Sequence, residues 1–269
     1  MKKLIVANWK MNPQTPREAR GLFSKVKLAA GKLRQTQVVI CPSAVFLTLL
    51  KSGKNLALGG QDIFELGPSG APARPNGRSG GFTGSISAAQ IKYAGAEYVI
   101  LGHSERRRSL ATAGQGETDE LINKKVRLAL ETGLKVILCV GETTRDERGD
   151  YLKVLRAMIE HGLERVVRAE IKSLVVAYEP VWAIGGLTQV ADTPEGFLEH
   201  SLFIKKVLAA RFGQAAAMAV PILYGGSVSP ENVRDFLTRG EASGLLVGHE
   251  SLRADHFNQI LRLADDARN

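Results

Sequence analysis

The stretch "KVILCV", residues 135–140, decides the class of fold. The five residues after Lys135 are all apolar, with no polar residue alternating between them. A strand with one solvent-facing side alternates apolar and polar residues, so an unbroken apolar run predicts a strand covered on both faces, as in a parallel sheet. Seven further runs share this character: "LIVA" (4–7), "VVIC" (38–41), "LALGG" (56–60), "YVILG" (98–102), "LVVAY" (174–178), "PILY" (221–224) and "GLLVG" (244–248).

Helical patterns lie between these eight runs. Two cap signals, Thr193-Pro194-Glu195 and Ser229-Pro230-Glu231, each place a hydroxyl before a proline at the expected first helical position. The stretch after residue 41 predicts only a short helix. Apolar residues recur at helical spacing in four segments: 19–33, 122–130, 152–166 and 257–264.

Eight strands alternating with helices predict a closed (β/α)8 TIM barrel with parallel strands. Residues 1–269 are interpreted as a single barrel domain. The alternative is a doubly wound open sheet, which would carry a glycine-rich dinucleotide fingerprint after the first strand. The sequence there, "ANWKMNP" (7–13), is not such a fingerprint.

The net charge of +9 raises the hypothesis of a nucleic-acid partner. Residues 1–35 contain nine Lys or Arg and one Glu, a net charge of +8, so the remaining chain is nearly neutral. Within 19–33 the basic residues fall mostly between the apolar ones, which predicts an amphipathic helix with a solvated basic face. We therefore expect no nucleic-acid partner.

Neither a membrane span nor a secretory signal is indicated. No apolar run approaches the roughly 20 residues of a spanning helix, and the apolar start soon reaches Asn8 and Lys10. Cys41 and Cys139 lie inside apolar runs without a nearby Cys or His at metal-ligand spacing. We expect buried thiols, no metal site and a cytoplasmic location.

One segment interrupts the alternation of strands and helices. Residues 62–84, "DIFELGPSGAPARPNGRSGGFTG", are rich in Gly, Pro and Ser. Long loops inside compact domains are usually functional or disordered. The sequence therefore predicts a long loop within the domain, after the third strand.

Polar residues gather where the predicted strands end. In a barrel of this kind the carboxyl ends of all strands open on one face, where active sites lie. Each residue taken singly has a structural explanation as a cap, an ion-pair partner or a turn. Their common placement predicts an active site, formed by Asn8 and Lys10, His103 to Glu105, Glu179, Gly225 to Ser227, and Gly248 with His249.

Several strings, in order along the chain, resemble the triosephosphate isomerase family, and the similarity covers nearly the whole sequence. The longest two are specific to that family. The strings are "ANWKMN" (7–12), "FTGSIS" (82–87), "LGHSERR" (101–107), "CVGE" (139–142), "AYEPVWAIG" (177–185), "YGGSV" (224–228) and "LLVG" (245–248).

The resemblance implies interconversion of glyceraldehyde 3-phosphate and dihydroxyacetone phosphate through an enediolate, in glycolysis and gluconeogenesis. Glu179 matches the family's catalytic base, and His103 matches the electrophile that stabilises the enediolate. Lys10 matches the cation, Asn8 a hydrogen-bond donor to the substrate, and Glu105 a residue that orients Lys10. No metal or cofactor is implied, because proton transfer and electrostatics suffice.

Further residues match the family's phosphate site and dimer contact. Gly185, Ser227, Gly248 and His249 match positions that bind the substrate phosphate, where glycine turns and backbone N–H groups favour an anion. "PVWAIGG" matches the start of a lid that excludes water. Loop 62–84, with Thr83 matching the family's loop tip, implies a homodimer.

Three departures from the family pattern leave the substrate open. The family's "GTGKTA" is the longer "GGLTQVAD" (185–192), which lacks the second hinge. Gly248 precedes His249 and Glu250 rather than a second glycine, and "QD" at 61–62 replaces "QN". The alternatives are an isomerase of a four-carbon ketose phosphate, such as erythrulose phosphate, or a non-catalytic phosphate-binding barrel.

Overall fold

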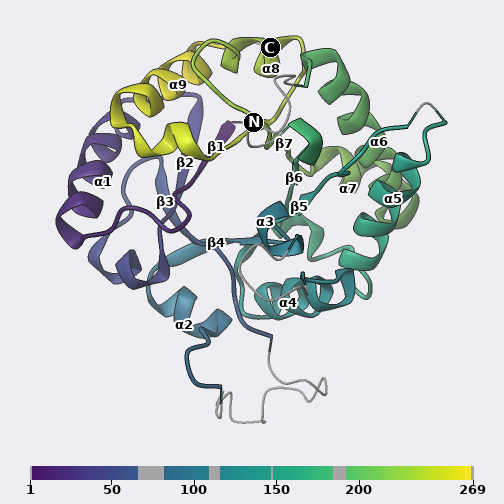
Figure 1. The fold of residues 1–269 in the computed structure, drawn as a ribbon, viewed down its shortest axis with the longest axis horizontal. Helices are drawn as coiled ribbons and strands as arrows, with labels where there is room; N and C mark the ends of the chain where they lie inside the picture. Colours follow the sequence, from purple (N-terminus) through teal and green to yellow (C-terminus); the bar gives the residue numbers. More distant parts are fainter. Residues whose placement is uncertain (1, 66–81, 109–115, 147, 184–191, 268–269) are drawn as a thin grey trace.

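Eight parallel strands close into a barrel in the computed structural model (Figure 1). The structure describes residues 2–65, 82–108, 116–146, 148–183 and 192–267. All eight predicted strands are confirmed, with small differences at their ends. Their bounds are β1 Lys3–Asn8, β2 Thr36–Cys41, β3 Leu56–Gly60, β4 Ala96–Leu101, β5 Lys135–Val140, β6 Leu174–Tyr178, β7 Ile222–Tyr224 and β8 Gly244–Val247.

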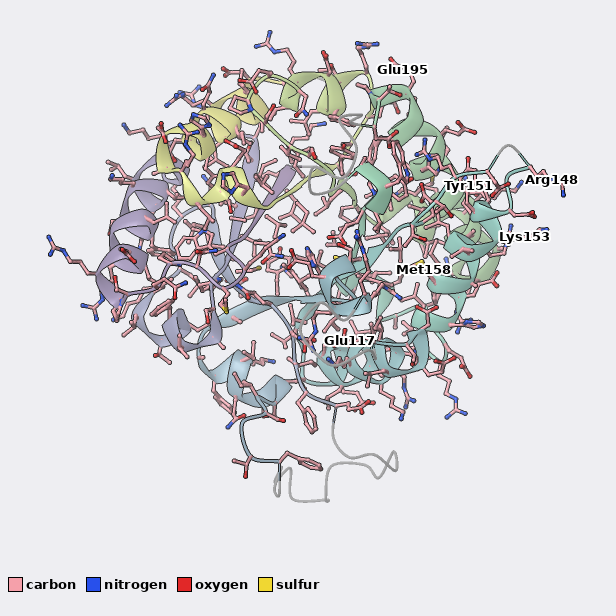
Figure 2. All side chains as sticks on the ribbon, in the orientation of Figure 1. Glu117, Arg148, Tyr151, Lys153, Met158 and Glu195 are labelled. Carbon is pink, nitrogen blue, oxygen red and sulfur yellow. The ribbon has the colours of Figure 1, made fainter. Side chains whose placement is uncertain are left out.

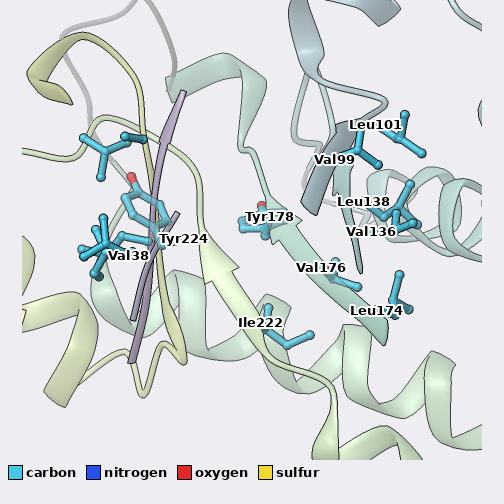
Figure 3. Packing of buried hydrophobic residues seen from close by; sticks show 14 of the residues in the cluster. Val38, Val99, Leu101, Val136, Leu138, Leu174, Val176, Tyr178, Ile222 and Tyr224 are labelled. Atoms are coloured by element: carbon cyan, nitrogen blue, oxygen red, sulfur yellow. The ribbon is translucent and has the colours of Figure 1, made fainter. Parts of the chain in front are cut away.

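Burial on both faces accounts for the unbroken apolar runs. Along β5, Val136, Leu138 and Val140 belong to an outer core between the barrel and the helices. Ile137 and Cys139 alternate with them and belong to an inner core made of strand residues alone. Figure 3 shows the outer core, in which side chains from β4, β5 and β6 lie side by side. Burying a large apolar side chain contributes about 1.5–3 kcal/mol of stability. Side chains on both faces of the strand therefore stabilise the fold.

Helices surround the strands and cover the outer core (Figure 1). The first and last helices, α1 and α9, pack against each other and complete the ring. In the described part of the chain the α-helices are α1 Pro16–Ala30, α2 Ala88–Tyr93, α3 Ser104–Arg107, α4 Asp119–Glu131, α5 Tyr151–Gly162, α6 Pro194–Phe212, α7 Gln214–Ala219, α8 Val233–Thr238 and α9 Ala254–Asp266. The described 3₁₀ helices are η1 Ala44–Leu49, η2 Ile171–Ser173, η3 Val181–Ala183 and η4 His249–Leu252.

Capping side chains set the starts of α1 and α6. The Thr15 hydroxyl accepts from the Glu18 N–H, and the Glu18 carboxylate accepts from the Thr15 N–H, so both form a capping box. Thr193 caps α6 by accepting from the Gly196 N–H at 3.0 Å. The cap predicted at Thr193-Pro194-Glu195 is therefore confirmed.

Two predicted helix limits were wrong. Helix α8 begins at Val233, not at Pro230, because the Ser229 carbonyl accepts from the N–H groups of both Asn232 and Val233, and Asn232 Oδ1 accepts from the Ser229 N–H. These bonds build a separate turn before the helix. Helix α5 ends at Gly162, and Arg165 then takes a left-handed conformation with φ of 61°. The predicted apolar face up to residue 166 is thus only partly helical.

Both cysteines are free and fully buried, as predicted. Burial raises the pKa of the Cys41 thiol well above its ordinary range, so this side chain stays protonated. Among the described helices, none combines the length and the apolar character needed to cross a membrane.

The closure of the barrel depends on a glycine. A β-carbon at Gly244, the residue paired with Leu4, would collide with the Leu4 carbonyl oxygen. We expect Gly244→Ala to lower the free energy of unfolding by about 3 kcal/mol, because β1 and β8 would be forced apart. The measurement is the midpoint of urea unfolding followed by circular dichroism.

Gly21 supplies the matched control. It is exposed in α1, and a β-carbon there has nothing within 4 Å. Gly21→Ala should raise the free energy of unfolding by about 1 kcal/mol through helix propensity. Equal effects of the two changes would contradict a special role for the β1–β8 contact.

Candidate active site

The strand ends deliver the predicted residues to one mouth of the barrel. Asn8 is the last residue of β1, and Lys10 lies two positions beyond it. His103 follows β4, and Glu179 directly follows β6. A cavity of ≈ 800 Å³ opens at this mouth and is lined in part by Asn8, Lys10, His103 and Glu105. The structure therefore brings together all five residues predicted to be catalytic.

Glu179 is a buried carboxylate held by neutral donors. Its residue is 2 % exposed. Its Oε2 accepts from the backbone N–H of Ser104 at 2.8 Å, and its Oε1 lies 3.3 Å from His103 Nε2. A β-carbon at Gly225 would lie 2.9 Å from the Glu179 Cγ, so glycine leaves this carboxylate room. The Ser104 donor was not predicted from the sequence.

The ring of His103 is oriented by the start of α3. His103 is the N-cap residue, and its Nδ1 accepts from the backbone N–H of Glu105 at 3.3 Å. Because an accepting Nδ1 carries no proton, the proton of the neutral ring is on Nε2. Nε2 is the nitrogen that faces Glu179, so the ring presents a donor to the site.

Lys10 is held in a strained backbone conformation. Its φ is 52°, which is uncommon for a residue with a side chain and indicates that the surroundings impose it. Its N–H donates to Asn8 Oδ1 at 3.1 Å, and its carbonyl accepts from Gln61 Nε2 at 2.7 Å. Its ammonium forms an ion pair with Glu105. Hydrogen bonds to its backbone and the ion pair of its side chain thus orient Lys10 toward the mouth of the barrel.

Of the four residues predicted to bind phosphate, Ser227, Gly248 and His249 lie on the turns after β7 and β8. Ser227 is exposed, and its hydroxyl donates to the Ala183 carbonyl at 3.0 Å. A β-carbon at Gly248 would lie 3.8 Å from the Lys10 Cε, so this turn adjoins the cation. His249 is exposed at the start of η4. Gly185 and positions 186–191 of the predicted lid lie outside the described residues.

Glu250 does not stand as a free anion beside this turn. Its Oε2 lies 2.5 Å from His256 Nδ1 on α9. The pairing directs the carboxylate toward α9 and links η4 to that helix. The sequence alone indicated the acidic residue but not its partner.

A buried ionic cluster borders the same cavity. The Lys125 ammonium lies 2.8 Å from Asp62 Oδ2 and 2.5 Å from Glu117 Oε1, and Arg106 Nη2 contacts the same two carboxylates at 2.8 and 2.6 Å. Burial raises the pKa of Asp62 despite the attraction of Lys125. For Glu117, burial opposes ionisation, but hydrogen bonds and charge from Arg106 and Lys125 hold its pKa below the ordinary value.

Sequence reasoning missed this cluster, although a signal was present. Lys125 lies on the α4 face that carries Ile122 and Val126, and it is 3 % exposed. A lysine on the apolar face of a helix needs an acidic partner in the folded protein. Its partners Asp62 and Glu117 come from other segments, so spacing could not identify them.

A second carboxylate, Glu142 after β5, holds the segment that follows Glu179. It is 2 % exposed. It accepts from the Tyr178 hydroxyl at 2.7 Å, from Trp182 Nε1 at 2.9 Å and from Arg145 Nε at 3.0 Å. Tyr178 immediately precedes Glu179, so these bonds fix the backbone on both sides of the buried carboxylate.

The carboxyl ends of the eight parallel strands carry a carboxylate, a ring donor and an anchored ammonium. This arrangement is typical of (β/α)8-barrel enzymes that work by proton transfer. The family model described as triosephosphate isomerase matches residues 3–264. The chain belongs to the triosephosphate isomerase family and is an isomerase. The family predicted from the motifs is therefore confirmed.

Curated relatives from several bacteria agree with this assignment. A triosephosphate isomerase of Carboxydothermus hydrogenoformans is 40% identical over 97% of this chain and 98% of the relative. One of Citrifermentans bemidjiense is 38% identical over 98% and 99%, and one of Nitratidesulfovibrio vulgaris is 40% identical over 97% and 99%. These similarities do not favour the four-carbon substrate raised by the altered lid.

The buried ionic cluster yields a stability prediction. Lys125→Met should lower the free energy of unfolding by about 2–3 kcal/mol, because it leaves the carboxylates of Asp62 and Glu117 with Arg106 as their remaining cation. Thermal and urea unfolding would measure the loss.

Lys124 is the control for that measurement, since it is the preceding residue of α4 and is exposed. Lys124→Met should change stability by no more than about 0.5 kcal/mol. A Lys125→Met protein as stable as the Lys124→Met protein would show that the cluster is not what holds this wall of the cavity.

Proposed function

We propose that the chain interconverts glyceraldehyde 3-phosphate and dihydroxyacetone phosphate, with Glu179 as base and His103 as electrophile. The observation that supports this most directly is the 3.3 Å contact between Glu179 Oε1 and His103 Nε2 inside the barrel mouth. A base and a proton donor at that separation can reach adjacent carbons of a small α-hydroxy carbonyl. The position of Lys10 beside them fits an anionic substrate and a developing negative charge.

The proton transfer follows from the directions of these groups. Substrate replaces the contact between Glu179 and His103, so that the carboxylate faces a carbon-bound hydrogen and Nε2–H faces the carbonyl oxygen. Glu179 removes the proton, and the electron pair moves onto the oxygen to form the enediolate. The hydroxyl proton on the carbon that lost its hydrogen passes to this oxygen by way of His103 Nε2, and Glu179 returns its proton to the former carbonyl carbon, so the carbonyl moves by one position. A neutral imidazole donor is the established electrophile of triosephosphate isomerases.

Lys10, Asn8 and Glu105 have supporting roles in this proposal. The Lys10 ammonium stabilises the negative oxygen, and its ion pair with Glu105 keeps it in place. Asn8 uses its Oδ1 to accept from the Lys10 N–H, so its amide N–H₂ is the end it offers to a substrate oxygen.

The phosphate group lies, in this proposal, over the turns after β7 and β8. Backbone N–H groups at Gly185, Ser227, Gly248 and His249 hold it, because peptide N–H groups in open turns favour an anion. The exposed position of Ser227 and the nearness of the Gly248 turn to Lys10 support this placement.

We also propose that residues 1–269 form one domain that contains loop 62–84 and that works in the cytoplasm. The continuous ring of strands from β1 to β8 supports the single domain. Two free, buried thiols suit a reducing compartment. The reaction belongs to glycolysis and gluconeogenesis.

A coupled assay on the purified protein tests the proposed reaction. We expect fast turnover of glyceraldehyde 3-phosphate and little turnover of a four-carbon ketose phosphate. Glu179→Asp withdraws the base by one methylene and should lower kcat at least about a hundredfold. Glu179→Gln removes the base and serves as the blank.

Folding controls decide how that assay is interpreted. Both Glu179 variants should keep the wild-type circular dichroism spectrum and melting temperature. Near-normal turnover by Glu179→Asp would remove Glu179 from the role of base. Fast tetrose turnover with slow triose turnover would instead show that the altered lid sequence marks a changed substrate.

We further propose a homodimer formed through loop 62–84, including Thr83. The described ends of the loop lie together, because Phe64 and Phe82 pack with ring centroids 4.9 Å apart. Met11 and Ile86, 82 % and 38 % exposed, line the cavity beside them, and Val45, 72 % exposed, directly follows Ala44 of the same lining. Such a patch fits burial against a second copy of the chain.

A charge placed in that patch should separate the subunits. We expect wild-type protein to show the mass of two chains by light scattering after gel filtration. Val45→Asp should shift that mass to one chain, because a dimer would bury the new carboxylate without a partner.

Val167 provides the matched control, since it is also an exposed valine, 56 % exposed, but lies between α5 and β6. Val167→Asp should leave the mass unchanged. A wild-type mass of one chain, or an unchanged mass for Val45→Asp, would contradict the proposed dimer.

A further inference from the structure

Glu250 is an acidic residue beside a turn that the proposed function assigns to an anion. The turn after β8 runs through Gly248 and His249, and Glu250 is the next residue along the chain. A carboxylate close to a bound phosphate opposes binding, because two negative charges repel each other. The structure must therefore separate this carboxylate from the phosphate if the turn is to bind substrate.

The backbone of the turn holds Glu250 close to Gly248. The N–H and the hydroxyl of Ser251 both donate to the Gly248 carbonyl, at 2.9 and 2.6 Å. Ser251 is fully buried, so these two bonds close residues 248–251 into one compact turn. Only the direction of the Glu250 side chain can therefore keep its carboxylate away from a phosphate bound at Gly248.

His256 determines that direction. Glu250 Oε2 lies 2.5 Å from His256 Nδ1, and the two side chains are 21 % and 31 % exposed, so the contact is partly shielded from water. In the described part of the chain no lysine or arginine pairs with Glu250. Arg253, three positions further along, contacts Asp255 at 3.9 Å instead. His256 is therefore the group that holds the Glu250 carboxylate against α9.

Two other carboxylates interact with the same imidazole. Asp255 Oδ2 lies 4.0 Å from His256 Nε2. Glu231 belongs to the segment between β7 and α8, and its pKa lies below the ordinary value, first because of its hydrogen bond to Ser229 and in smaller part because of the charge of His256. A protonated ring at this position thus offsets part of the negative charge carried by three segments near the two phosphate turns.

We propose that His256 is a positioning residue for phosphate binding, which holds the Glu250 carboxylate against α9 and so keeps its negative charge away from the substrate phosphate. His256 touches neither the substrate nor the reacting atoms, and it acts through Glu250. Both residues lie outside the strings that resemble the family, so the resemblance did not predict the pair. The inference rests on the proposed function, in which the phosphate lies over the turns after β7 and β8.

A double-mutant cycle in enzyme kinetics tests this role. His256→Ala frees the carboxylate, so KM for glyceraldehyde 3-phosphate should rise about fivefold while kcat changes by less than about twofold, because the charge opposes binding and not the chemical step. Glu250→Gln removes the charge itself and should leave KM close to the wild-type value. The double variant should also return to the wild-type KM, since it has no carboxylate left to repel the phosphate.

Two further variants serve as controls. His256→Lys keeps a cation for Glu250 and should hold KM within about twofold of the wild-type value. Arg239→Ala is the matched control, since Arg239 Nη2 lies 2.6 Å from Glu195 Oε1 and its removal also frees a carboxylate. Figure 2 shows Glu195 at the outer rim of the ring of helices, away from the mouth of the barrel. Arg239→Ala should therefore leave KM and kcat unchanged.

Binding of glycerol 3-phosphate tests the same role without any turnover, because this probe carries the phosphate but no carbonyl group. Isothermal titration calorimetry should give a Kd about fivefold higher for His256→Ala than for the wild type, and a wild-type Kd for the double variant. Salt screens repulsion between charges, so this ratio should fall toward one as sodium chloride is raised from about 0.02 to about 0.5 M. A damaged turn would not recover with salt in this way.

Each outcome of these measurements decides a separate question. A wild-type KM and Kd in His256→Ala would overturn the role of His256, and so would a double variant that stays as impaired as His256→Ala. A Kd ratio that does not change with salt would point to a structural tie and overturn it as well. A wild-type protein that fails to isomerise triose phosphate, yet shows the binding cycle, would refute the proposed function alone.

Discussion

The pairing of β1 with β8 is the contact on which the rest of the structure depends. It joins Leu4 to Gly244 and Ala7 to Val247, and it turns a sheet with two edges into a ring. In a closed ring the backbone groups of every strand are paired, and the carboxyl ends of all strands meet at one mouth. That closure brings the turn at Gly248 next to Lys10, although the two are far apart in the sequence. The site therefore depends first on the closure of the barrel, and only then on its individual side chains.

Backbone geometry then determines the direction in which the side chains of the site point. Lys10 is turned by a left-handed conformation that Asn8 and Gln61 hold through hydrogen bonds to its N–H and carbonyl. The backbone N–H of Glu105 donates to His103 Nδ1 and so determines the tautomer of the His103 ring. The helix start determines which nitrogen faces Glu179, and the same short helix supplies the Ser104 N–H that holds that carboxylate. One turn of chain after β4 thus orients both partners of the proposed proton transfer.

The sequence predicts those parts of the molecule whose physics is local. Strands buried on both faces leave an unbroken apolar run, as "KVILCV" does, and residues after such runs reach the mouth by construction. Helix α8 was misplaced because bonds between Ser229 and Asn232 compete with the cap signal. The ion pairs of Arg145 with Asp192 and of Lys125 with Asp62 join residues 47 and 63 positions apart. No local pattern specifies such partners, so they emerge only from the folded chain.

The buried carboxylates around the mouth differ in the groups with which they pair. Glu117 pairs with Arg106 and Lys125, and Glu142 pairs with Arg145, so each already has a permanent cation. Among the described residues, Glu179 contacts the His103 imidazole and the Ser104 backbone N–H, and the Cys139 thiol also hydrogen-bonds to it. Among the described residues, Glu179 forms no ion pair with a Lys or Arg, whereas Glu117 and Glu142 do, and this difference agrees with the proposed role of Glu179 as the base.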